Sequence, residues 1–426
     1  MTNPSLSPST LPRSNRSRIA GLIVVATLSL IPCQLQAQHF QVLHNFTGGL
    51  DGSAPYAGLS MDRGGNLYGT TTAGGHGFGT VFALLHRGSG WAFNPLYGFA
   101  GGSDGEGPTA RVIVGPNGSL YGTTYAGGGT GCSDGYGCGT IFNLRPSPSV
   151  CRAALCGWDE TVLYRFTGGS DGANPLLGDV IFDQAGNIYG TTQNGGSANC
   201  GGTGCGTVFE LSPNGGGWTE KVLYSFTGAG GDGANPYSGV IFDQSGNLDG
   251  TTRQGGPAAN GTVFRLTPNG SSWTENILYG FPSINDGYWP YGGLMLDHSG
   301  NLFGTTSSGG LNGGGTAFEV TTSGSVDVFF NFAGPAYGGP YGTLTSDAAG
   351  NLYGVAYDDG AYGNGSVFKL TPTVNGWSYT DLYDFTGGTD GRCPYGGALL
   401  DAQGNLYGTA AAGGQYDVGV VWELTP

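Results

Sequence analysis

The stretch Gly65–Thr71, GNLYGTT, decides the fold, because six further copies of it follow along the chain. The copies are GSLYGTT (118–124), GNIYGTT (186–192), GNLDGTT (246–252), GNLFGTT (300–306), GNLYGVA (350–356) and GNLYGTA (404–410). Successive copies begin 50 to 68 residues apart. This period is longer than that of ankyrin or leucine-rich repeats, and it suits a four-stranded propeller blade whose loops vary in length.

Three other short segments recur with these copies. An aromatic segment, mostly LYxF, lies at 43–46, 96–99, 163–166, 223–226, 278–281, 329–332 and 382–385. A segment that follows a Pro and ends in Asp lies at 56–62, 237–243, 291–297 and 395–401. The third, GTVFAL and its variants, lies at 79–84, 139–144, 206–211, 261–266, 315–320, 365–370 and 419–424. All are rich in β-branched or aromatic residues and bounded by Gly, Asn and Pro, which predicts four strands in each of seven units.

The order of these segments predicts how a ring of such units closes. We expect the Pro-to-Asp segment to be the innermost strand, GNLYGTT the second, GTVFAL the third and LYxF the outermost. The chain opens with a lone aromatic strand at 40–46 and ends with 419–424, so the last unit lacks one strand until the first strand joins it. Closure of this kind removes an exposed sheet edge. We therefore predict, over 38–426, an all-β, seven-bladed β-propeller with four antiparallel strands per blade, closed by the N-terminal strand joining the C-terminal blade.

Composition agrees with a β-rich, turn-rich protein. Glycine accounts for 88 of 426 residues and charged residues for only 10%, which excludes a coiled coil or a helix bundle, while 12% aromatic residues argue against disorder. Part of the glycine belongs to a recurring DxxGN turn such as Asp62–Asn66, where Asp bonds the turn backbone and Gly takes a positive φ. A Trp that we expect to pack between neighbouring blades precedes LYxF in five units: Trp91, Trp158, Trp218, Trp273 and Trp377.

Residues 1–37 are predicted to be a signal peptide. Three arginines precede an apolar run at 19–31, and Ala37 offers a small residue at a cleavage site. The run is too short for a membrane span, which needs about 20 residues. Lipid attachment at Cys33 is disfavoured because Pro32 precedes it. We expect a secreted, extracellular protein, or a periplasmic one.

The chain is acidic, with a formal net charge of −15 that becomes −18 when the three arginines of the signal are removed. Nucleic acid is excluded as a partner, because phosphate binding needs a basic face. Six loops each carry an Asp-Gly that could attract a hard cation such as Ca²⁺: Asp51, Asp104, Asp171, Asp232, Asp286 and Asp390. The alternative is that each Asp only shapes its turn, since one carboxylate per loop falls short of the about six to eight oxygens that calcium takes.

Cysteines also recur locally. Three close pairs are predicted to be disulfides, as secretion permits: Cys132 with Cys138, Cys151 with Cys156, and Cys200 with Cys205. Structural zinc is disfavoured because the spacings are not those of CxxC pairs and no His lies nearby. Cys393 is left over, either free or intermolecular.

Positions that break the repeat are the candidate ligand-binding residues. Arg111 and Asp179 replace an innermost-strand residue that is Gly in four other units, and both are expected to line the channel. They either orient a carboxylate or sugar ligand or form a structural ion pair. Further candidates stand singly near loops: His76, Glu106, Trp289 and Arg392.

The repeat unit, LYxFtGGxDGxxPxxGLxxDxxGNLYGTTxxGGxxGxGTVFxL, resembles the Gloeo/Verruco (GloVer) tandem repeat of secreted bacterial proteins, over essentially all of 39–426. This resemblance implies a β-propeller-like repeat and export. It brings no activity and no catalytic residue to carry over.

Two functions follow from these observations. The first is a secreted, non-catalytic binding module for a carbohydrate, peptide or protein ligand on its loop face. The second is a metal-assisted propeller enzyme, a lactonase, lyase or glycosidase, with its site at the channel mouth and substrate held by Arg111 and Asp179. The first is favoured because the chain has no GxSxG, HExxH or P-loop motif.

Overall fold

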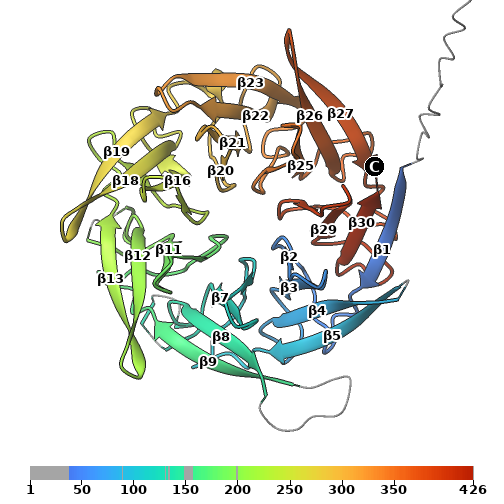
Figure 1. Cartoon of the computed structure of the whole chain (residues 1–426), viewed down its shortest axis with the longest axis horizontal. Coiled ribbons are helices and arrows are strands. Elements are labelled where there is room, and N and C mark those ends of the chain that lie inside the picture. Colours follow the sequence, from blue (N-terminus) through green and yellow to red (C-terminus); the bar gives the residue numbers. More distant parts are fainter. Residues whose placement is uncertain are drawn as a thin grey trace, which may run out of the picture. The chain divides into compact units, whose positions relative to one another are not determined.

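The computed structural model describes residues 38–88, 90–129, 131–132, 135–147, 157–197 and 200–425. The predicted signal peptide lies outside these residues. Within the unit Gln38–Pro426, seven four-stranded antiparallel sheets stand around a central channel (Figure 1). This confirms the predicted seven-bladed β-propeller and, with it, the predicted strand order from the channel outward.

The blades are numbered along the chain, and their strands are given from the channel outward. Blade 1 contains β2 (Ser60–Met61), β3 (Leu67–Thr71), β4 (Thr80–Arg87) and β5 (Gly90–Gly98). Blade 2 contains β6 (Ile113–Val114), β7 (Leu120–Thr124), β8 (Thr140–Pro146) and β9 (Trp158–Arg165). Blade 3 contains β10 (Ile181–Phe182), β11 (Ile188–Thr192), β12 (Thr207–Asn214) and β13 (Gly217–Ser225). Blade 4 contains β15 (Ile241–Phe242), β16 (Leu248–Thr252), β18 (Thr262–Asn269) and β19 (Ser272–Gly280).

The remaining blades follow the same pattern. Blade 5 contains β20 (Met295–Leu296), β21 (Leu302–Thr306), β22 (Gly313–Val320) and β23 (Val326–Ala333). Blade 6 contains β24 (Thr345–Ser346), β25 (Leu352–Ala356), β26 (Ser366–Thr373) and β27 (Gly376–Asp384). Blade 7 contains β28 (Leu399–Leu400), β29 (Leu406–Ala410), β30 (Val420–Thr425) and β1 (His39–Asn45). Two loop strands, β14 (Gly233–Ala234) and β17 (Gln254–Gly255), pair with each other, and a 3₁₀ turn, η1, covers Ile284–Asp286.

The ring closes in blade 7, where the first strand of the chain meets the last. β1 pairs antiparallel with β30, with Phe40 opposite Leu424 and Val42 opposite Trp422. Figure 1 shows the blue β1 alongside the dark red β30. The predicted closure by the N-terminal strand is therefore confirmed.

The second Gly of the GNLYGTT motif is required by packing inside each blade. A Cβ on Gly69 would lie 2.5 Å from the ring of Phe82 on the neighbouring third strand. The same clash recurs in every blade, at 2.2 Å from Trp422 for Gly408 and at 2.4 to 2.7 Å from a Phe ring in the others. Any side chain here would push the second and third strands apart, because protein interiors are close-packed.

The DxxGN turns join the innermost strand to the second strand. In blade 1, Asp62 accepts hydrogen bonds from the backbone N of Gly64 (2.8 Å) and of Asn66 (2.9 Å) and from the hydroxyl of Tyr68 (3.0 Å). Partial burial opposes ionisation of Asp62, but these hydrogen bonds outweigh it and lower the pKa of the carboxyl. The bonds to the turn backbone recur at Asp183, Asp243, Asp297, Asp347 and Asp401. The expected structural role of this Asp is confirmed.

Aromatic residues on the outermost strands join neighbouring blades. Trp91 of blade 1 packs on Tyr407 of blade 7, with ring centroids 5.8 Å apart, as expected for this recurring Trp. Two residues further along the strand, Phe93 stacks on His44 at 3.8 Å.

Blades 2, 3 and 4 carry Glu at the Phe93 position: Glu160, Glu220 and Glu275. Burial, together with the nearby charges of Asp104, Asp171 and Asp232 respectively, raises the pKa of each Glu to about 7.

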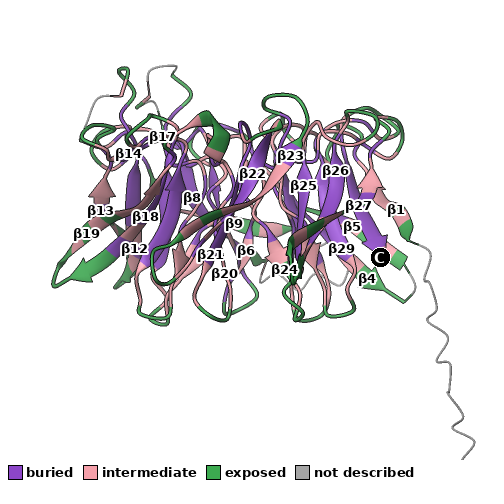
Figure 2. Cartoon of the chain, turned by 90° about the horizontal axis from the view of Figure 1, so that it is seen from above, coloured by how far each residue is buried: buried purple, intermediate pink, exposed green. Residues whose placement is uncertain are grey.

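The propeller has two distinct faces. The turn face consists of the DxxGN turns and of the hairpins between third and outermost strands. The mouth face consists of the loops that lead to each innermost strand and the loops between second and third strands, which bridge to one another, as at Ser53 and Ala73. In Figure 2 the buried strands lie between these two layers of more exposed loops.

Candidate ligand-binding site at the channel mouth

A Pro-Tyr dipeptide precedes the innermost strand in five consecutive blades around the ring, from blade 4 to blade 1. The five tyrosines are Tyr237, Tyr291, Tyr341, Tyr395 and Tyr56. Their ring centroids follow one another at 4.8, 4.7, 4.6 and 5.4 Å. We call this continuous set the tyrosine arc. Burial raises the pKa of Tyr291 and Tyr395 above that of a free tyrosine, so their hydroxyls stay protonated and can both donate and accept.

The sequence reasoning missed the tyrosine arc. The recurring Pro-Tyr was visible, but it was interpreted as the beginning of a strand. The signal was that two blades depart from it, with Thr109 in blade 2 and Leu176 in blade 3. The mouth is therefore aromatic over five blades and non-aromatic over two.

The channel narrows directly below the tyrosine arc. A Cβ on Gly342 would lie 2.2 Å from the backbone N of Gly397, and one on Gly396 would lie 2.1 Å from the backbone N of Gly58. The innermost strands of blades 6, 7 and 1 thus meet backbone to backbone, which requires glycine. The cavity above and beside this constriction has a volume of about 150 Å³, roughly that of a cavity known to take one six-membered ring.

Arg111 and Asp179 lie on the other side of this cavity, in blades 2 and 3. The Asp179 carboxylate accepts from Arg111 Nη2 at 2.7 Å, from Nε at 2.9 Å and from the Arg111 backbone N at 3.0 Å. Both side chains remain partly exposed, at 35% and 26%. The structure brings these two candidates together as an ion pair on the channel wall, and their contact with a ligand stays a prediction.

Arg253 lies at the end of the tyrosine arc that belongs to blades 4 and 5, and it is not among the residues that line the cavity. It follows directly after the second strand of blade 4, and its guanidinium carbon lies 4.3 Å from the ring centroid of Trp289. The centroids of Tyr237 and Tyr291 are 5.2 and 5.3 Å away, and Nε donates to the Tyr291 hydroxyl at 2.8 Å. Trp289, a predicted candidate, also stacks on Tyr337 at 5.2 Å. Sequence reasoning missed Arg253 because it stands in one loop, whereas its partners come from two others.

Backbone hydrogen bonds hold the residues of the mouth in place. The residue before the Pro that leads to the innermost strand takes a positive φ in six blades. It is glycine in blade 2, and it is a non-glycine residue in the other five: Ala54, Asn174, Asn235, Trp289 and Cys393. Trp289 shows the arrangement, since its N–H donates to Asn260 of blade 4 at 2.9 Å and its C=O accepts from Ser307 N of blade 5 at 3.2 Å. Non-glycine residues with positive φ are uncommon and concentrate at sites that the surrounding structure determines strongly. The side chains of the mouth are therefore presented on a rigid frame.

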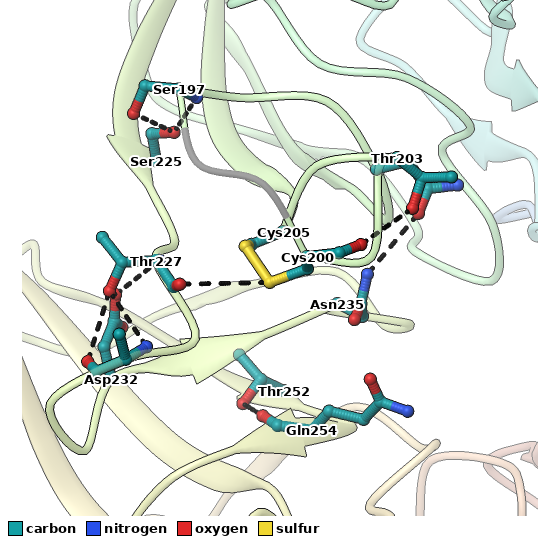
Figure 3. Close-up of a disulfide and its surroundings, with 12 residues drawn as sticks. Ser197, Cys200, Thr203, Cys205, Ser225, Thr227, Asp232, Asn235, Thr252 and Gln254 are labelled. Carbon is teal, nitrogen blue, oxygen red and sulfur yellow. Dashed lines mark hydrogen bonds between the residues drawn. A yellow bond between two sulfur atoms is a disulfide. The ribbon is translucent and has the colours of Figure 1, made fainter. Parts of the chain in front are cut away.

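Two predicted disulfides staple loops of this frame. Cys132–Cys138 and Cys200–Cys205 are formed, which confirms those predictions, and Figure 3 shows the second beside Asn235 of the next blade. The C=O of Cys205 accepts from Asn235 N at 2.7 Å, so the stapled loop positions the start of blade 4. The predicted pair Cys151 and Cys156 lies outside the described residues. Cys393 forms no disulfide with any described residue.

The other single candidates lie away from the cavity lining among the described residues. His76 is exposed on the loop between β3 and β4. Glu106 forms a backbone bridge with Ala126. Arg392 pairs with Asp417 at 3.0 Å on the rim. Ligand contact by His76, Glu106 or Arg392 stays a prediction.

The Asp-Gly carboxylates each bond within their own loop. Asp51, for example, accepts from the backbone N of Thr47 at 2.9 Å and from its hydroxyl at 2.5 Å. Equivalent local bonds are made by Asp104, Asp171, Asp232, Asp286 and Asp390. The described residues contain no group of three or more His, Cys, Asp or Glu arranged to hold a metal ion. These bonds fit the turn role, and calcium binding by the six loops stays a prediction.

Exposed hydrophobic side chains gather on the same face. Eight large ones are exposed among the described residues, and seven of them lie in loops of the mouth face: Leu50, Tyr136, Ile284, Leu311, Tyr337, Tyr362 and Tyr416. The eighth, Val374, lies in a hairpin of the turn face. Exposed apolar groups that concentrate in this way mark interaction surfaces.

The ring of seven sheets and the site at its mouth define the class as a seven-bladed β-propeller. The sequence matches the family model described as the Gloeobacter/Verrucomicrobia repeat over residues 29–203 and 200–422. The chain therefore belongs to this repeat family, as the resemblance of its repeat unit implied. The comparison with curated proteins found no match.

Several solved structures share the fold at low sequence identity. The polysaccharide lyase Uly1 is 12% identical, with a TM-score of 0.50, over 87% of this chain and 89% of that one. A protein of unknown function from Dyadobacter fermentans is 12% identical, with a TM-score of 0.47, over 78% and 98%. The gluconolactonase XC5397 from Xanthomonas campestris is 14% identical, with a TM-score of 0.42, over 74% and 85%. At these identities the likeness concerns the fold alone.

Helices capable of crossing a membrane are absent from the described part of the chain.

Proposed function

We propose that this protein is a secreted, non-catalytic binding module that takes a carbohydrate at the channel mouth. The observation that carries the proposal is the tyrosine arc, in which five tyrosines from five blades follow one another around the mouth, and four of them line a single cavity: Tyr291, Tyr341, Tyr395 and Tyr56. A regular scaffold gives no reason for two of its seven blades to lack this tyrosine. We therefore attribute the asymmetry of the tyrosine arc to a ligand.

The chemistry of the arc suits a sugar. A pyranose presents an apolar C–H face and a polar edge of hydroxyls, and tyrosine presents an apolar ring and a hydroxyl that donates and accepts. Gln193 Nε2 already donates to the Tyr237 hydroxyl at 3.0 Å, so the arc carries polar groups at fixed positions. The cavity of about 150 Å³ suits one ring at a time. Apolar surface with a few well-placed polar groups is typical of small-ligand sites.

Secretion is supported by the two disulfides among the described residues, since disulfides persist in oxidising compartments. The acidic composition, with a formal net charge of −15, favours solubility outside the cell and disfavours nucleic acid.

The experiment is a titration of the chain, expressed without residues 1–37, with a panel of neutral and acidic oligosaccharides, followed by calorimetry. We expect at least one oligosaccharide to bind. Tyr341→Ala should weaken this binding by at least about tenfold, a loss typical of a hot-spot residue. Tyr341→Phe, which keeps the ring, should retain part of the affinity. The matched control is Tyr416→Ala, an exposed rim tyrosine that does not line the cavity.

Four outcomes would overturn the proposal. The first is that no oligosaccharide binds, and the second is that Tyr341→Ala binds as the parent does. The third is chain cleavage or ring opening of the saccharide during the titration, which would show catalysis. Binding of a tyrosine-dependent peptide in place of any sugar would also refute the carbohydrate assignment.

A further inference from the structure

Arg253 is a cation held in place at the mouth by aromatic rings rather than by a carboxylate. Its guanidinium lies over Trp289, Tyr237 and Tyr291 and donates from Nε to the Tyr291 hydroxyl. The other two arginines of the mouth face that break the repeat are paired, Arg111 with Asp179 and Arg392 with Asp417. Within the described residues no Asp or Glu lies within 4.0 Å of the Arg253 guanidinium.

The guanidinium of Arg253 has donors to spare. Arginine carries five N–H donors in a planar fork. The Tyr291 hydroxyl takes one, and the Tyr237 hydroxyl also interacts with the group. Neither acceptor carries a negative charge, because burial raises the pKa of both tyrosines. The charge of Arg253 is therefore uncompensated locally in a protein whose net charge is −15.

We infer that the carbohydrate bound at the tyrosine arc is acidic, and that Arg253 binds the carboxylate of one of its uronic acid residues. This inference rests on the proposed function and adds to it the class of sugar. A guanidinium fork matches a carboxylate in bidentate geometry, and such charge-assisted pairs are the strong ones. Because the aromatic rings already fix the orientation of Arg253, little side-chain entropy is lost when the pair forms.

The charges around the cavity also give the acidic sugar a direction. Asp179 is neutralised by Arg111 across the channel. Asp358 follows Tyr357, whose ring lies 5.3 Å from that of Tyr341 in blade 6, whereas Arg253 contacts the Tyr237 and Tyr291 rings that lead into blades 4 and 5. A uronate is therefore attracted at blades 4 and 5 and repelled at blade 6, which orients it along the tyrosine arc.

The test compares each uronate oligomer with its own methyl ester, which keeps the sugar skeleton and removes the charge. Tetramers of α-1,4-galacturonate, β-1,4-glucuronate and β-1,4-mannuronate are titrated into the full mature chain. We expect at least one acidic tetramer to bind at least about tenfold more tightly than its ester. Arg253→Gln should abolish that preference and leave the ester affinity within about twofold, while Arg253→Lys should keep part of it. Arg87→Gln, which removes an exposed arginine from a hairpin of the turn face, is the matched control.

The inference is overturned when esters bind as tightly as acids, when Arg253→Gln keeps the preference, or when no acidic tetramer binds. Failure of the proposed function has a different signature. If neutral sugars and esters bind and Tyr341→Ala abolishes this binding, the carbohydrate site stands and only the role of Arg253 falls. If no sugar of either series binds, or binding ignores Tyr341, both proposals fall. Circular dichroism of Arg253→Gln distinguishes lost recognition from lost structure.

Discussion

The two faces of the propeller are built from the same repeats, yet they differ in how much variation they tolerate. On the turn face, six DxxGN turns make the same backbone hydrogen bonds to the same Asp carboxylate. On the mouth face, the position after Pro is Tyr in five blades, Thr109 in blade 2 and Leu176 in blade 3, and seven large hydrophobic side chains are exposed. Positions that are alike from blade to blade serve to stabilise the scaffold. Where blades disagree, they are available for a ligand.

The largest effect is expected from opening the ring. Deleting residues 38–45 removes β1, leaves the β30 edge unpaired and removes the Phe40 ring that stacks on Tyr383 at 3.9 Å. We expect Tm to fall by more than about 10 °C and the chain to self-associate, because an exposed edge strand pairs with other chains. Thermal unfolding and size-exclusion chromatography measure this, with a chain that begins at Gln38 as control. An unchanged Tm would contradict closure by β1.

The next largest effect is expected at the second Gly of the GNLYGTT motif, which packs between the second and third strands of each blade. Gly304→Ala places a Cβ 2.4 Å from the Phe318 ring and 3.0 Å from Leu294. We expect a loss of about 1–3 kcal/mol in the free energy of unfolding, as in other overpacked cores. Chemical denaturation measures it. Gly217→Ala, at a glycine that has no positive φ and open space around its Cβ position, is the control for the presence of an extra methyl group. Equal stability of the two variants would refute the packing argument.

A carboxylate of the turn face should matter more than one of the mouth face. Asp62→Ala removes an acceptor of three or more hydrogen bonds, and we expect it to cost about 1–3 kcal/mol. Asp417→Ala, at an exposed rim position, should change stability little. The pKa of Asp62 is lowered on folding, so its contribution is present above the unfolded pKa of about 4 and is lost as pH falls through the folded pKa. Denaturation of both variants at pH 7 and pH 3 measures this; a gap as large at pH 3 as at pH 7 would contradict it.

The smallest effect has the opposite pH dependence. The pKa of Glu160, Glu220 and Glu275 is raised to about 7 by burial and by neighbouring Asp charges. Their neutral forms suit the folded state, so the stability that they contribute is present at low pH and is lost as pH rises through about 7. The triple change to Gln should therefore raise Tm at pH 8.5 and leave it nearly unchanged at pH 5. Asp159→Asn, an exposed neighbour, is the control, and a triple variant that is less stable at pH 8.5 would refute the assignment.

The scaffold could be predicted from the sequence and most of the candidate site could not, for a physical reason. Strand order, closure and the DxxGN turns depend on residues within one repeat or at the chain ends, so periodicity reveals them. The tyrosine arc depends on contacts such as Tyr341 to Tyr395, which join corresponding positions of neighbouring blades 54 residues apart. Arg253 was invisible for the same reason, because its rings come from other loops. Arg111 and Asp179 were found because both break the repeat at one position.

We expect the ligand to lie at the tyrosine arc. The most direct measurement is a crystal structure of the chain with the oligosaccharide that binds it best. We predict a sugar ring in the cavity against Tyr291 or Tyr341. When the sugar is acidic, its carboxylate should lie within contact distance of Arg253. A sugar bound on the turn face, for example beside Asp62–Asn66, or only on the outer strands with the arc empty, would contradict it.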